Sequence, residues 1–289
     1  MQVHLVDGTY ELYRQHFGQA TRHSDPPPFA GTIGVLTSTI QLLQDGATHI
    51  GVATDHVIES FRNDLYDGYK TSEGMEPVLL EQIPILEDAL RAMGVTVWAM
   101  EKYEADDALA SAATKACEDR TVHKVLILTP DKDLGQCVQG KRVVQFDRRN
   151  NIMIDEAAVV LKFGVGPSSI ADYLGLVGDS ADGFPGLQGW GAKSASTVLA
   201  KYQLIDNIPD DHNQWIADGV TVRSAEKLAT TLRDNRKDAA LFKQLATLIT
   251  DVPVGDVGDW LWRGPTDRFE EVANKLGAPQ LVERLRRLK

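Results

Sequence analysis

Cysteine is scarce in this chain of 289 residues, which contains two, Cys117 and Cys137. Their spacing fits no zinc site, so we interpret both as small buried side chains rather than as a disulfide or a redox pair. Long apolar runs are missing too, because none approaches the roughly 20 residues that span a bilayer. The first residues enter a strand directly, without a signal-peptide pattern. These absences predict a cytoplasmic protein that contacts no membrane.

Basic residues are also fewer than acidic ones. The chain has 41 acidic residues against 30 basic ones, a net charge of −11. A general nucleic-acid coat protein should be basic, so this balance disfavours that class. A metal-dependent nuclease remains compatible, because bound cations offset the acids of such a site and then meet the substrate phosphates. The length suits one large domain or two unequal ones.

What the chain does have is acidic residues placed directly after apolar, strand-like segments. Parallel strands of an open α/β sheet bring their C-terminal ends to one edge, where ligands bind. Carboxylates that meet there repel one another unless cations neutralise them. We therefore predict a site for several Mg²⁺ ions and for phosphate chemistry. The strands are expected at 2–6, 49–54, 95–99 and 124–129, and the acids that follow them are Asp7, Asp55, Glu104, Asp106, Asp107, Asp131 and Asp133.

Strand-like and helix-like segments alternate through residues 1–150, which predicts a mostly parallel sheet. Residues 56–77 are polar, aromatic and partly irregular, and they fit either a lid or arch over the site or an ordinary surface loop. Beyond residue 155 we expect a helical subdomain. The expected helices are 31–44, 78–93, 105–117, 155–163, 168–176, 193–201, 224–233, 236–248 and 267–288.

Two of the acidic clusters have other interpretations. Glu104 and Asp107 are three residues apart and share a helix face, so they also fit a solvated helix start whose negative charge suits the helix dipole. Asp131-Lys-Asp133 also fits a phosphatase with an aspartyl nucleophile. That motif normally lies near the N-terminus and is followed by Thr or Val. Here Leu134 follows and the motif lies deep in the chain, which disfavours the phosphatase.

A glycine-rich segment adds two more acids, Asp179 and Asp182, and then opens a helix with Gly189-Trp-Gly-Ala-Lys193. A Gly-x-Gly turn at a helix start presents free backbone N–H groups to a phosphate. The segment is not a Walker A loop, because Ala192 stands where that loop requires lysine. A plain packing junction between two helices is the alternative.

Several of these motifs resemble the bacterial and phage 5′→3′ exonuclease and flap endonuclease family, which includes the nuclease domain of DNA polymerase I. The motifs are Tyr103-Glu-Ala-Asp-Asp107, Thr129-Pro-Asp-Lys-Asp-Leu134 and 178–195, with Val6-Asp-Gly8, Phe61-Arg62, Tyr69-Lys70 and 245–253 in the family's order. The resemblance implies an α/β fold. Its parts would be a PIN-like nuclease core with a mostly parallel central sheet at 1–155, an arch at 56–77, and a C-terminal helical subdomain at 156–289 with a helix–three-turn–helix element near 168–201.

The resemblance implies a stand-alone, structure-specific 5′→3′ exonuclease and flap endonuclease that hydrolyses DNA phosphodiesters in replication or repair. Its partner would be DNA with 5′ flaps, nicks or 5′ ends, and it would act as a monomer. The implied cofactors are two or three Mg²⁺ or Mn²⁺ ions, and K⁺ at the helical hairpin. The acids that match the family's metal-site residues are Asp7, Asp55, Glu104, Asp106, Asp107, Asp131, Asp133, Asp179 and Asp182.

By the same resemblance, Lys70 would contact the scissile phosphate from the arch and act with Asp131 and Asp133 in catalysis. Arg62 and Tyr69 would position the 5′ nucleotide. The hairpin residues implied in DNA contact are Gly189, Gly191 and Lys193, and those whose carbonyls would bind K⁺ are Leu187 and Trp190.

The sequence departs from the family at three positions. Glu73 stands where the family usually has arginine, Thr54 replaces phenylalanine, and Gly183 replaces asparagine. The missing arginine removes a phosphate clamp, for which Arg62 is a candidate substitute. This change favours a second hypothesis, a catalytically weak relative that binds DNA structures. A third hypothesis, an RNA-cutting PIN-like nuclease, is disfavoured by the Gly-rich hairpin, an element that grips duplex DNA.

Overall fold

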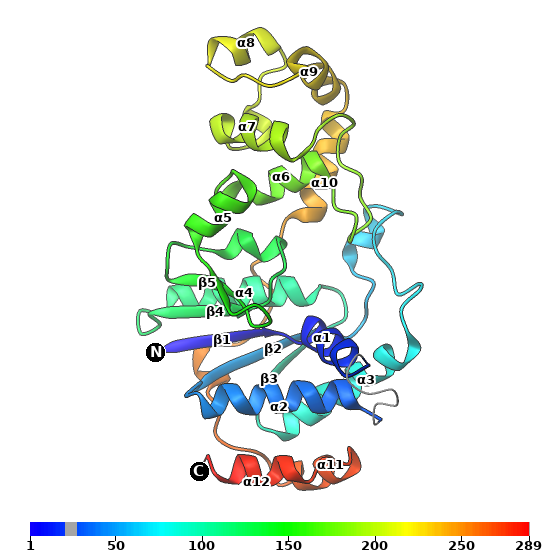
Figure 1. Ribbon diagram of the computed structural model, residues 1–289, viewed down its shortest axis with the longest axis vertical. Helices are drawn as coiled ribbons and strands as arrows, with labels where there is room; N and C mark the ends of the chain where they lie inside the picture. The colour runs from blue at the N-terminus through cyan, green and yellow to red at the C-terminus, as the bar shows by residue number, and fades with distance from the viewer. Residues whose placement is uncertain (21–27, 289) are drawn as a thin grey trace.

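A computed structural model of the chain describes residues 1–20 and 28–288. Its central layer is a six-stranded sheet with the order β3-β2-β1-β4-β5-β6 (Figure 1). Neighbouring strands pair in parallel, except that β6 is antiparallel to β5. The strand order reverses between β1 and β4, and ligands bind beside the carboxyl ends of strands at such a reversal. The strands are β1 (Gln2–Asp7), β2 (His49–Asp55), β3 (Thr96–Met100), β4 (Lys124–Leu128), β5 (Val143–Asp147) and β6 (Ile152–Ile154).

Alternate side chains of the strands enter two different cores, as the two-residue period of a strand requires. Val3 and Leu5 belong to a core with α4 (Ala105–Glu118), a helix rich in alanine that packs closely on the sheet. Val6 belongs to the opposite core. Helices α1 (Gly8–Ala20), α2 (Ala30–Gln44) and α3 (Pro77–Ala92) contribute to that second core.

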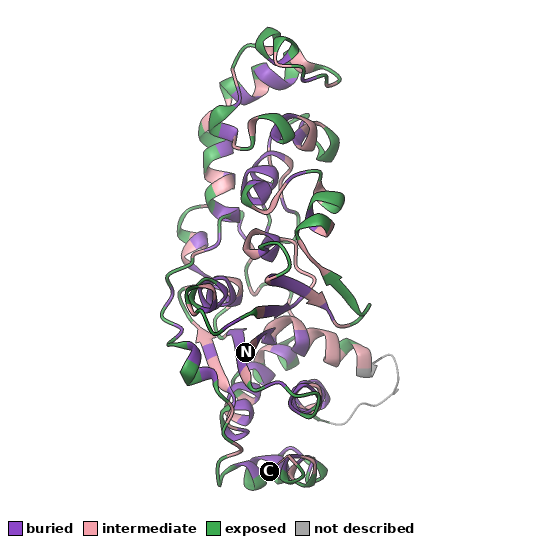
Figure 2. Cartoon of the chain, turned by 90° about the vertical axis from the view of Figure 1, so that its left-hand side faces the viewer, coloured by how far each residue is buried: buried purple, intermediate pink, exposed green. Residues whose placement is uncertain are grey.

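Residues 156–246 form a helical unit around a third hydrophobic core, which also includes Tyr69 and Val138 from earlier in the chain. Figure 1 shows this unit extending from the sheet to α8 and α9 at the far end of the molecule. Figure 2 shows its buried residues concentrated where the helices face one another. No helix of the described part of the chain combines the length and apolarity needed to cross a membrane. The helices of the unit are α5 (Glu156–Phe163), α6 (Ile170–Val177), α7 (Ala192–Tyr202), α8 (His212–Ala217), α9 (Ala225–Asp234) and α10 (Arg236–Ala246).

After α10 the chain returns to the sheet. Trp260 packs edge-on against Trp98 of β3, with ring centroids 5.4 Å apart, and the indole N–H groups of both donate to the carbonyl of Val254. The last two helices, α11 (Phe269–Lys275) and α12 (Gln280–Arg286), complete the core around α2 and α3. The expected helical subdomain at 156–289 is therefore too long, because its last forty or so residues pack on the α/β core.

The expected α/β fold with a mostly parallel sheet is confirmed, and the predicted strands and most predicted helices lie within a few residues of their observed bounds. The expected single helix at 267–288 is wrong. Gly277, at φ +73°, and Pro279 separate α11 from α12, since a left-handed glycine followed by proline does not continue a helix. Strands β5 and β6 and helices α1 and α8 were not predicted.

Arg62 connects three parts of the molecule. It lies in η1 (Phe61–Asp64), a short 3₁₀ turn of the arch segment 56–77, and is 1% exposed. Its guanidinium donates two 2.8 Å hydrogen bonds to Asp107 of α4 and one of 3.1 Å to Glu104. Two more go to the carbonyls of Leu245 and Thr247 at the end of α10, at 2.8 and 3.0 Å.

These bonds use all five guanidinium donors. The expectation that Arg62 positions the 5′ nucleotide, or replaces the missing phosphate clamp, is therefore corrected, because no donor is left for a phosphate or a base. Arg62 instead holds the segment 56–77, the α/β core and the helical unit together.

We predict that Arg62→Met lowers the free energy of unfolding by about 3–5 kcal/mol, because it leaves the buried carboxylate of Asp107 without its cation. Removing both charges in Arg62→Met/Asp107→Leu should recover part of that loss. The exposed Arg149→Met is the matched control and should change stability by less than about 0.5 kcal/mol. Chemical denaturation measures all three variants. Equal stability of Arg62→Met and wild type would contradict the structural role.

Candidate active site

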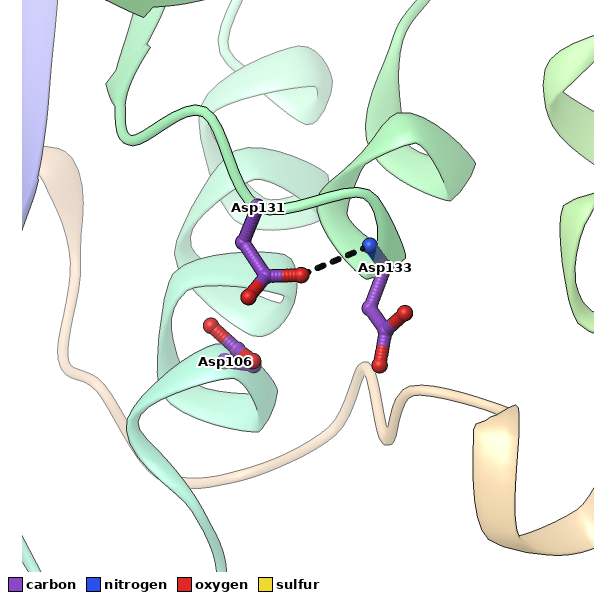
Figure 3. A group of neighbouring side chains, drawn as sticks. All are labelled: Asp106, Asp131 and Asp133. Carbon is purple, nitrogen blue, oxygen red and sulfur yellow. Dashed lines mark hydrogen bonds between the residues drawn. The ribbon is translucent and has the colours of Figure 1, made fainter. Parts of the chain in front are cut away.

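Asp106, Asp131 and Asp133 come from different elements and meet at the carboxyl edge of the sheet (Figure 3). Asp106 lies in the first turn of α4, and the other two lie after β4. One carboxylate oxygen of each lies within 4.8 Å of the others. The same limit holds for a second group, Asp133, Asp179 and Asp182, whose last two members lie between α6 and α7. Asp133 is thus shared by both groups.

Asp7 and Asp55 end the strands β1 and β2 at the same edge. Asp7 accepts hydrogen bonds from the backbone N–H of Tyr10 at 2.8 Å and from the hydroxyl of Thr129 at 3.0 Å. Asp55 accepts one from the backbone N–H of Ala105 at 2.8 Å. These bonds fix both carboxylates beside the reversal of strand order, where the sequence pattern predicted a site.

Burial and mutual repulsion raise the pKa values of these acids. The pKa of Asp7 is raised to about 7, by burial first and then by the neighbouring charges of Asp55 and Asp131. The pKa values of Asp106 and Asp133 are raised well above their usual range, again by burial first and then by neighbouring aspartates. Ionised carboxylates in such surroundings are costly, and a divalent cation compensates them.

The chemistry of the two groups fits a hard divalent cation. Every donor is a carboxylate oxygen, the kind of ligand that Mg²⁺ and Mn²⁺ prefer, and neither group contains cysteine or histidine. Oδ1 of Asp133 is buried and has no hydrogen-bond partner among the described residues, so its lone pairs are available to an ion. Each group offers three carboxylates to one ion, and Asp133 connects the two positions.

Two lysines partly neutralise these acids. Nζ of Lys70 lies 2.7 Å from Glu104 and 2.9 Å from Asp182, whose carbonyl also accepts the backbone N–H of Lys70 at 2.9 Å. Nζ of Lys132 lies 2.5 Å from the buried carboxylate of Asp179. Lys132 was not among the residues expected at the site, although its place inside the Asp-Lys-Asp motif was an available signal.

Asp107 binds a cation of the protein itself. It is completely buried, and both its oxygens accept hydrogen bonds from Arg62 and from the backbone N–H groups of Glu104 and Ile249. The expectation that Asp107 is a metal ligand is corrected on this ground. Burial alone would raise the pKa of Glu104, but Lys70 and Arg62 outweigh it and the pKa is lowered. Glu104 lies outside the two carboxylate groups and pairs with those two cations.

The arch segment packs directly on the site. Tyr69 is 3% exposed and its hydroxyl donates to Glu104 at 3.3 Å, so the expectation that its ring stacks on a nucleotide is corrected. Gly183 has φ +88°, and a Cβ there would collide with the carbonyl oxygen of Gly68. Glycine in place of the family's asparagine thus lets the arch approach the turn that carries Asp179 and Asp182. Glu73 is exposed and forms no ion pair with any described residue.

The hairpin residues lie apart from the acids. Gly189, Gly191 and Lys193 are exposed and line a separate cavity between α7 and α9. Leu187 and Trp190 are buried beneath them, and the carbonyl of Leu187 accepts the backbone N–H of Trp190 at 3.1 Å. The site residues expected from the sequence therefore divide into an acidic centre and a more distant, basic hairpin.

Raised pKa values predict that the protein without metal loses stability as the pH rises. Asp7 has a folded-state pKa of about 7, above the unfolded value of about 3.9. The folded state therefore holds the extra proton between these values, and stability falls as pH rises through this window. Asp106 and Asp133 shift in the same direction. With Mg²⁺ bound, the ion stabilises the ionised carboxylates and the fall should diminish or reverse.

Melting temperatures between about pH 5 and pH 8, in EDTA and in Mg²⁺, measure this effect. Asp133→Asn should have a weaker pH dependence in EDTA, since it removes one of the raised groups. An identical pH dependence in EDTA and in Mg²⁺ would contradict the assignment of these acids to a metal centre.

Comparison with known proteins identifies the two parts of the chain. Residues 2–164 match the family described as 5'-3' exonuclease, N-terminal resolvase-like domain, and residues 165–268 match 5'-3' exonuclease, C-terminal SAM fold. A 5'-3' exonuclease of Aquifex aeolicus is 30% identical, over 87% of this chain and 83% of that protein. DNA polymerase I of Bacillus caldotenax is 30% identical over 97% of this chain, which spans about a third of the length of that relative.

Solved structures share the fold. The T5 5'-exonuclease with bound zinc superposes with a TM-score of 0.68 at 17% identity, covering 100% of this chain and 98% of that one. The catalytic core of Rad2 in complex with DNA has a TM-score of 0.64 at 14% identity, covering 100% and 92%. With both family descriptions matched in order over residues 2–268, the chain belongs to the 5'-3' exonuclease family.

Proposed function

We propose that the protein is a divalent-metal-dependent, structure-specific 5′→3′ exonuclease and flap endonuclease, which hydrolyses DNA phosphodiesters near 5′ ends in replication or repair. The observation that carries this proposal is the pair of all-carboxylate groups joined by Asp133. Membership of the 5'-3' exonuclease family supports it. Relatives of the same fold include a T5 flap endonuclease in a pseudo-enzyme-product complex with DNA and metal ions.

The two groups suit a two-ion hydrolysis. Two divalent ions held by these groups would supply a hydroxide nucleophile and would stabilise the attacking and leaving oxygens of the phosphate. Asp106, Asp131 and Asp133 would hold one Mg²⁺ or Mn²⁺, and Asp179 and Asp182 would share Asp133 to hold the other. Asp7 and Asp55 would orient bound water around the first ion, because Mg²⁺ keeps several waters and needs few direct ligands.

Lys70 would meet the scissile phosphate. Its ammonium lies between Glu104 and Asp182, at the border of the second carboxylate group. A phosphate bound to ions in the two groups would lie next to this ammonium, which would stabilise negative charge that develops during cleavage. We assign Lys70 as a catalytic residue on this geometry. Glu104, which pairs with this ammonium, would keep the side chain of Lys70 in place.

DNA binding is assigned to the hairpin that opens α7. Gly189, Gly191 and Lys193 are exposed at the start of this helix, where backbone N–H groups and a lysine suit a phosphate. The carbonyls of Leu187 and Trp190 are the proposed K⁺ ligands. Contacts to the DNA backbone give affinity without reading sequence. The substrate would therefore be chosen by its structure, as DNA with a 5′ flap, nick or 5′ end bound by a monomer.

Cleavage of labelled 5′-flap DNA in Mg²⁺ tests this function. We expect cuts near the flap junction, and we expect both EDTA and Asp133→Asn to abolish them, because Asp133 serves both metal positions. Asp133→Asn should fold normally, since it removes carboxylate repulsion. Cutting that persists in EDTA or in the variant would refute the metal mechanism.

Two other outcomes separate the alternatives. Tight flap binding without cutting by the wild type would favour a DNA-structure-binding relative, a hypothesis that the exposed Glu73 at the family's arginine position supports. The variant Glu73→Arg would then be tested for restored cutting. Cutting of an RNA flap in preference to DNA would favour an RNA nuclease.

Lys70→Ala should slow single-turnover cleavage by about 10²–10³-fold, the usual effect of removing a group that stabilises transition-state charge. Flap affinity measured in Ca²⁺ should change by less than about threefold, since one phosphate contact adds little to the total. The exposed Lys102→Ala serves as the control and should match the wild type. Equal losses in cleavage rate and in affinity would show that Lys70 acts in binding only.

A further inference from the structure

The two carboxylate groups of the active site differ in how their charge is compensated. The first group is Asp106, Asp131 and Asp133, and the second is Asp133, Asp179 and Asp182. In the second group, Nζ of Lys132 lies 2.5 Å from Oδ2 of Asp179, and Nζ of Lys70 lies 2.9 Å from Asp182. No lysine, arginine or histidine among the described residues forms an ion pair with a member of the first group. Cations of the protein itself thus lie only at the second position.

The contact of Lys132 compensates charge without a hydrogen bond. Oδ2 of Asp179 is buried and has no hydrogen-bond partner among the described residues, although the ammonium of Lys132 lies 2.5 Å away. The directed bond that a lysine normally donates is therefore missing from this pair. Oδ1 of Asp133, in the same group, is also buried and without such a partner. Both oxygens keep lone pairs for a divalent ion, which prefers carboxylate ligands.

Lys132 can withdraw from Asp179 while its backbone stays in place. The backbone N–H of Asp133 donates to the carboxylate of Asp131 at 2.9 Å (Figure 3), and that of Gly135 donates to the carbonyl of Lys132 at 3.0 Å. The side chain of Lys132 is 30% exposed, and its ion-pair partner among the described residues is Asp179 alone. Because its stem is flexible and reaches solvent, the ammonium can move into water.

The other two cations beside these acids are held more firmly. Nζ of Lys70 lies between the carboxylates of Glu104 and Asp182, and the backbone N–H of Lys70 also donates to the carbonyl of Asp182. Arg62 is 1% exposed and uses all its guanidinium donors. Of the three, Lys132 is therefore the cation that a metal ion would displace most easily.

We propose that Lys132 is a displaceable counter-ion of the second metal position. Without metal, its ammonium compensates Asp179 and holds the motif 131–133 against the turn that carries this acid. A divalent ion bound by the second group takes the place of the ammonium and releases it to solvent. Because the ion has to break this pair, the second position binds more weakly than it would without the lysine. The inference rests on the metal centre of the proposed function and is independent of the substrate.

Titration with Mn²⁺ in the absence of DNA tests the proposal, because the electron paramagnetic resonance signal of the free ion gives the number of bound ions and the Kd of each. Lys132→Met keeps the length of the side chain and removes its charge. It should lower the Kd of the weaker ion about five- to thirtyfold, the ratio expected when one half-buried ion pair no longer has to be broken. The Kd of the tighter ion should change much less.

The same pair should also contribute to stability. In EDTA, Lys132→Met should melt below the wild type, because Asp179 loses its cation, and in saturating Mn²⁺ this difference should disappear. Lys132→Arg keeps the charge and can donate two parallel hydrogen bonds to the carboxylate, so it should not tighten the second ion. Lys141→Met is the matched control, since Lys141 is exposed and forms no ion pair with any described residue. It should bind both ions like the wild type.

An unchanged or higher Kd of the weaker ion in Lys132→Met would overturn the proposal, because a purely structural pair would hold Asp179 ready for the ion instead of competing with it. Binding of a single ion by both proteins would overturn it too. If Lys132→Met does not fold in EDTA, Lys132→Gln gives the same comparison. Failure of the wild type to cut flap DNA would refute the proposed function instead, and it would leave this titration, which contains no DNA, unaffected.

Discussion

Crowding of carboxylates at the reversal of strand order is the constraint on which the rest of the structure depends. Because β1 lies between β2 and β4, the fold brings Asp7, Asp55 and the acids after β4 to one edge. Burial there raises the pKa values of Asp7 and Asp133, so the folded chain without a bound ion carries an electrostatic cost. That cost is the free energy that a divalent ion recovers on binding, and it couples metal affinity to the fold.

The cations of the chain show how this cost is distributed. Lys70 and Lys132 neutralise the outer acids, and each connects a different segment to the turn that carries Asp179 and Asp182. Arg62 neutralises Asp107 one layer deeper, where the carboxylate is completely buried. The same motif, Glu104 to Asp107, therefore contributes Asp106 to the metal centre and Asp107 to the framework. Acidic residues adjacent in sequence serve different purposes because successive side chains of a helix point in different directions, about 100° apart.

The sequence correctly predicted that acids gather at the carboxyl edge of the sheet, because two independent signals agreed. Each predicted strand was followed by one or more acids, and parallel strands share one carboxyl edge. Prediction from the sequence failed for residues whose role depends on how deeply they are buried. Arg62 and Tyr69 were expected to contact substrate because their types suit a nucleotide, yet contacts more than 180 positions away along the chain, at Leu245 and Thr247, enclose Arg62. Short elements such as β6 were missed because tertiary pairing, rather than local pattern, stabilises them.

The separation of the acidic centre from the basic hairpin explains how a chain of net charge −11 would select DNA by its structure. Most of the surface repels a polyanion, so weak contact with arbitrary DNA is disfavoured. Divalent ions held at the sheet edge would attract the DNA backbone there, and the exposed Lys193 would attract it at the hairpin. A hydrogen bond from the indole N–H of Trp190, in the hairpin, to the carbonyl of Leu228 in α9 fixes the geometry of the second of these sites. Under the proposed function, a substrate binds well only when a 5′ end and a duplex occupy both positions at once, and that requirement is a test of shape rather than of base sequence.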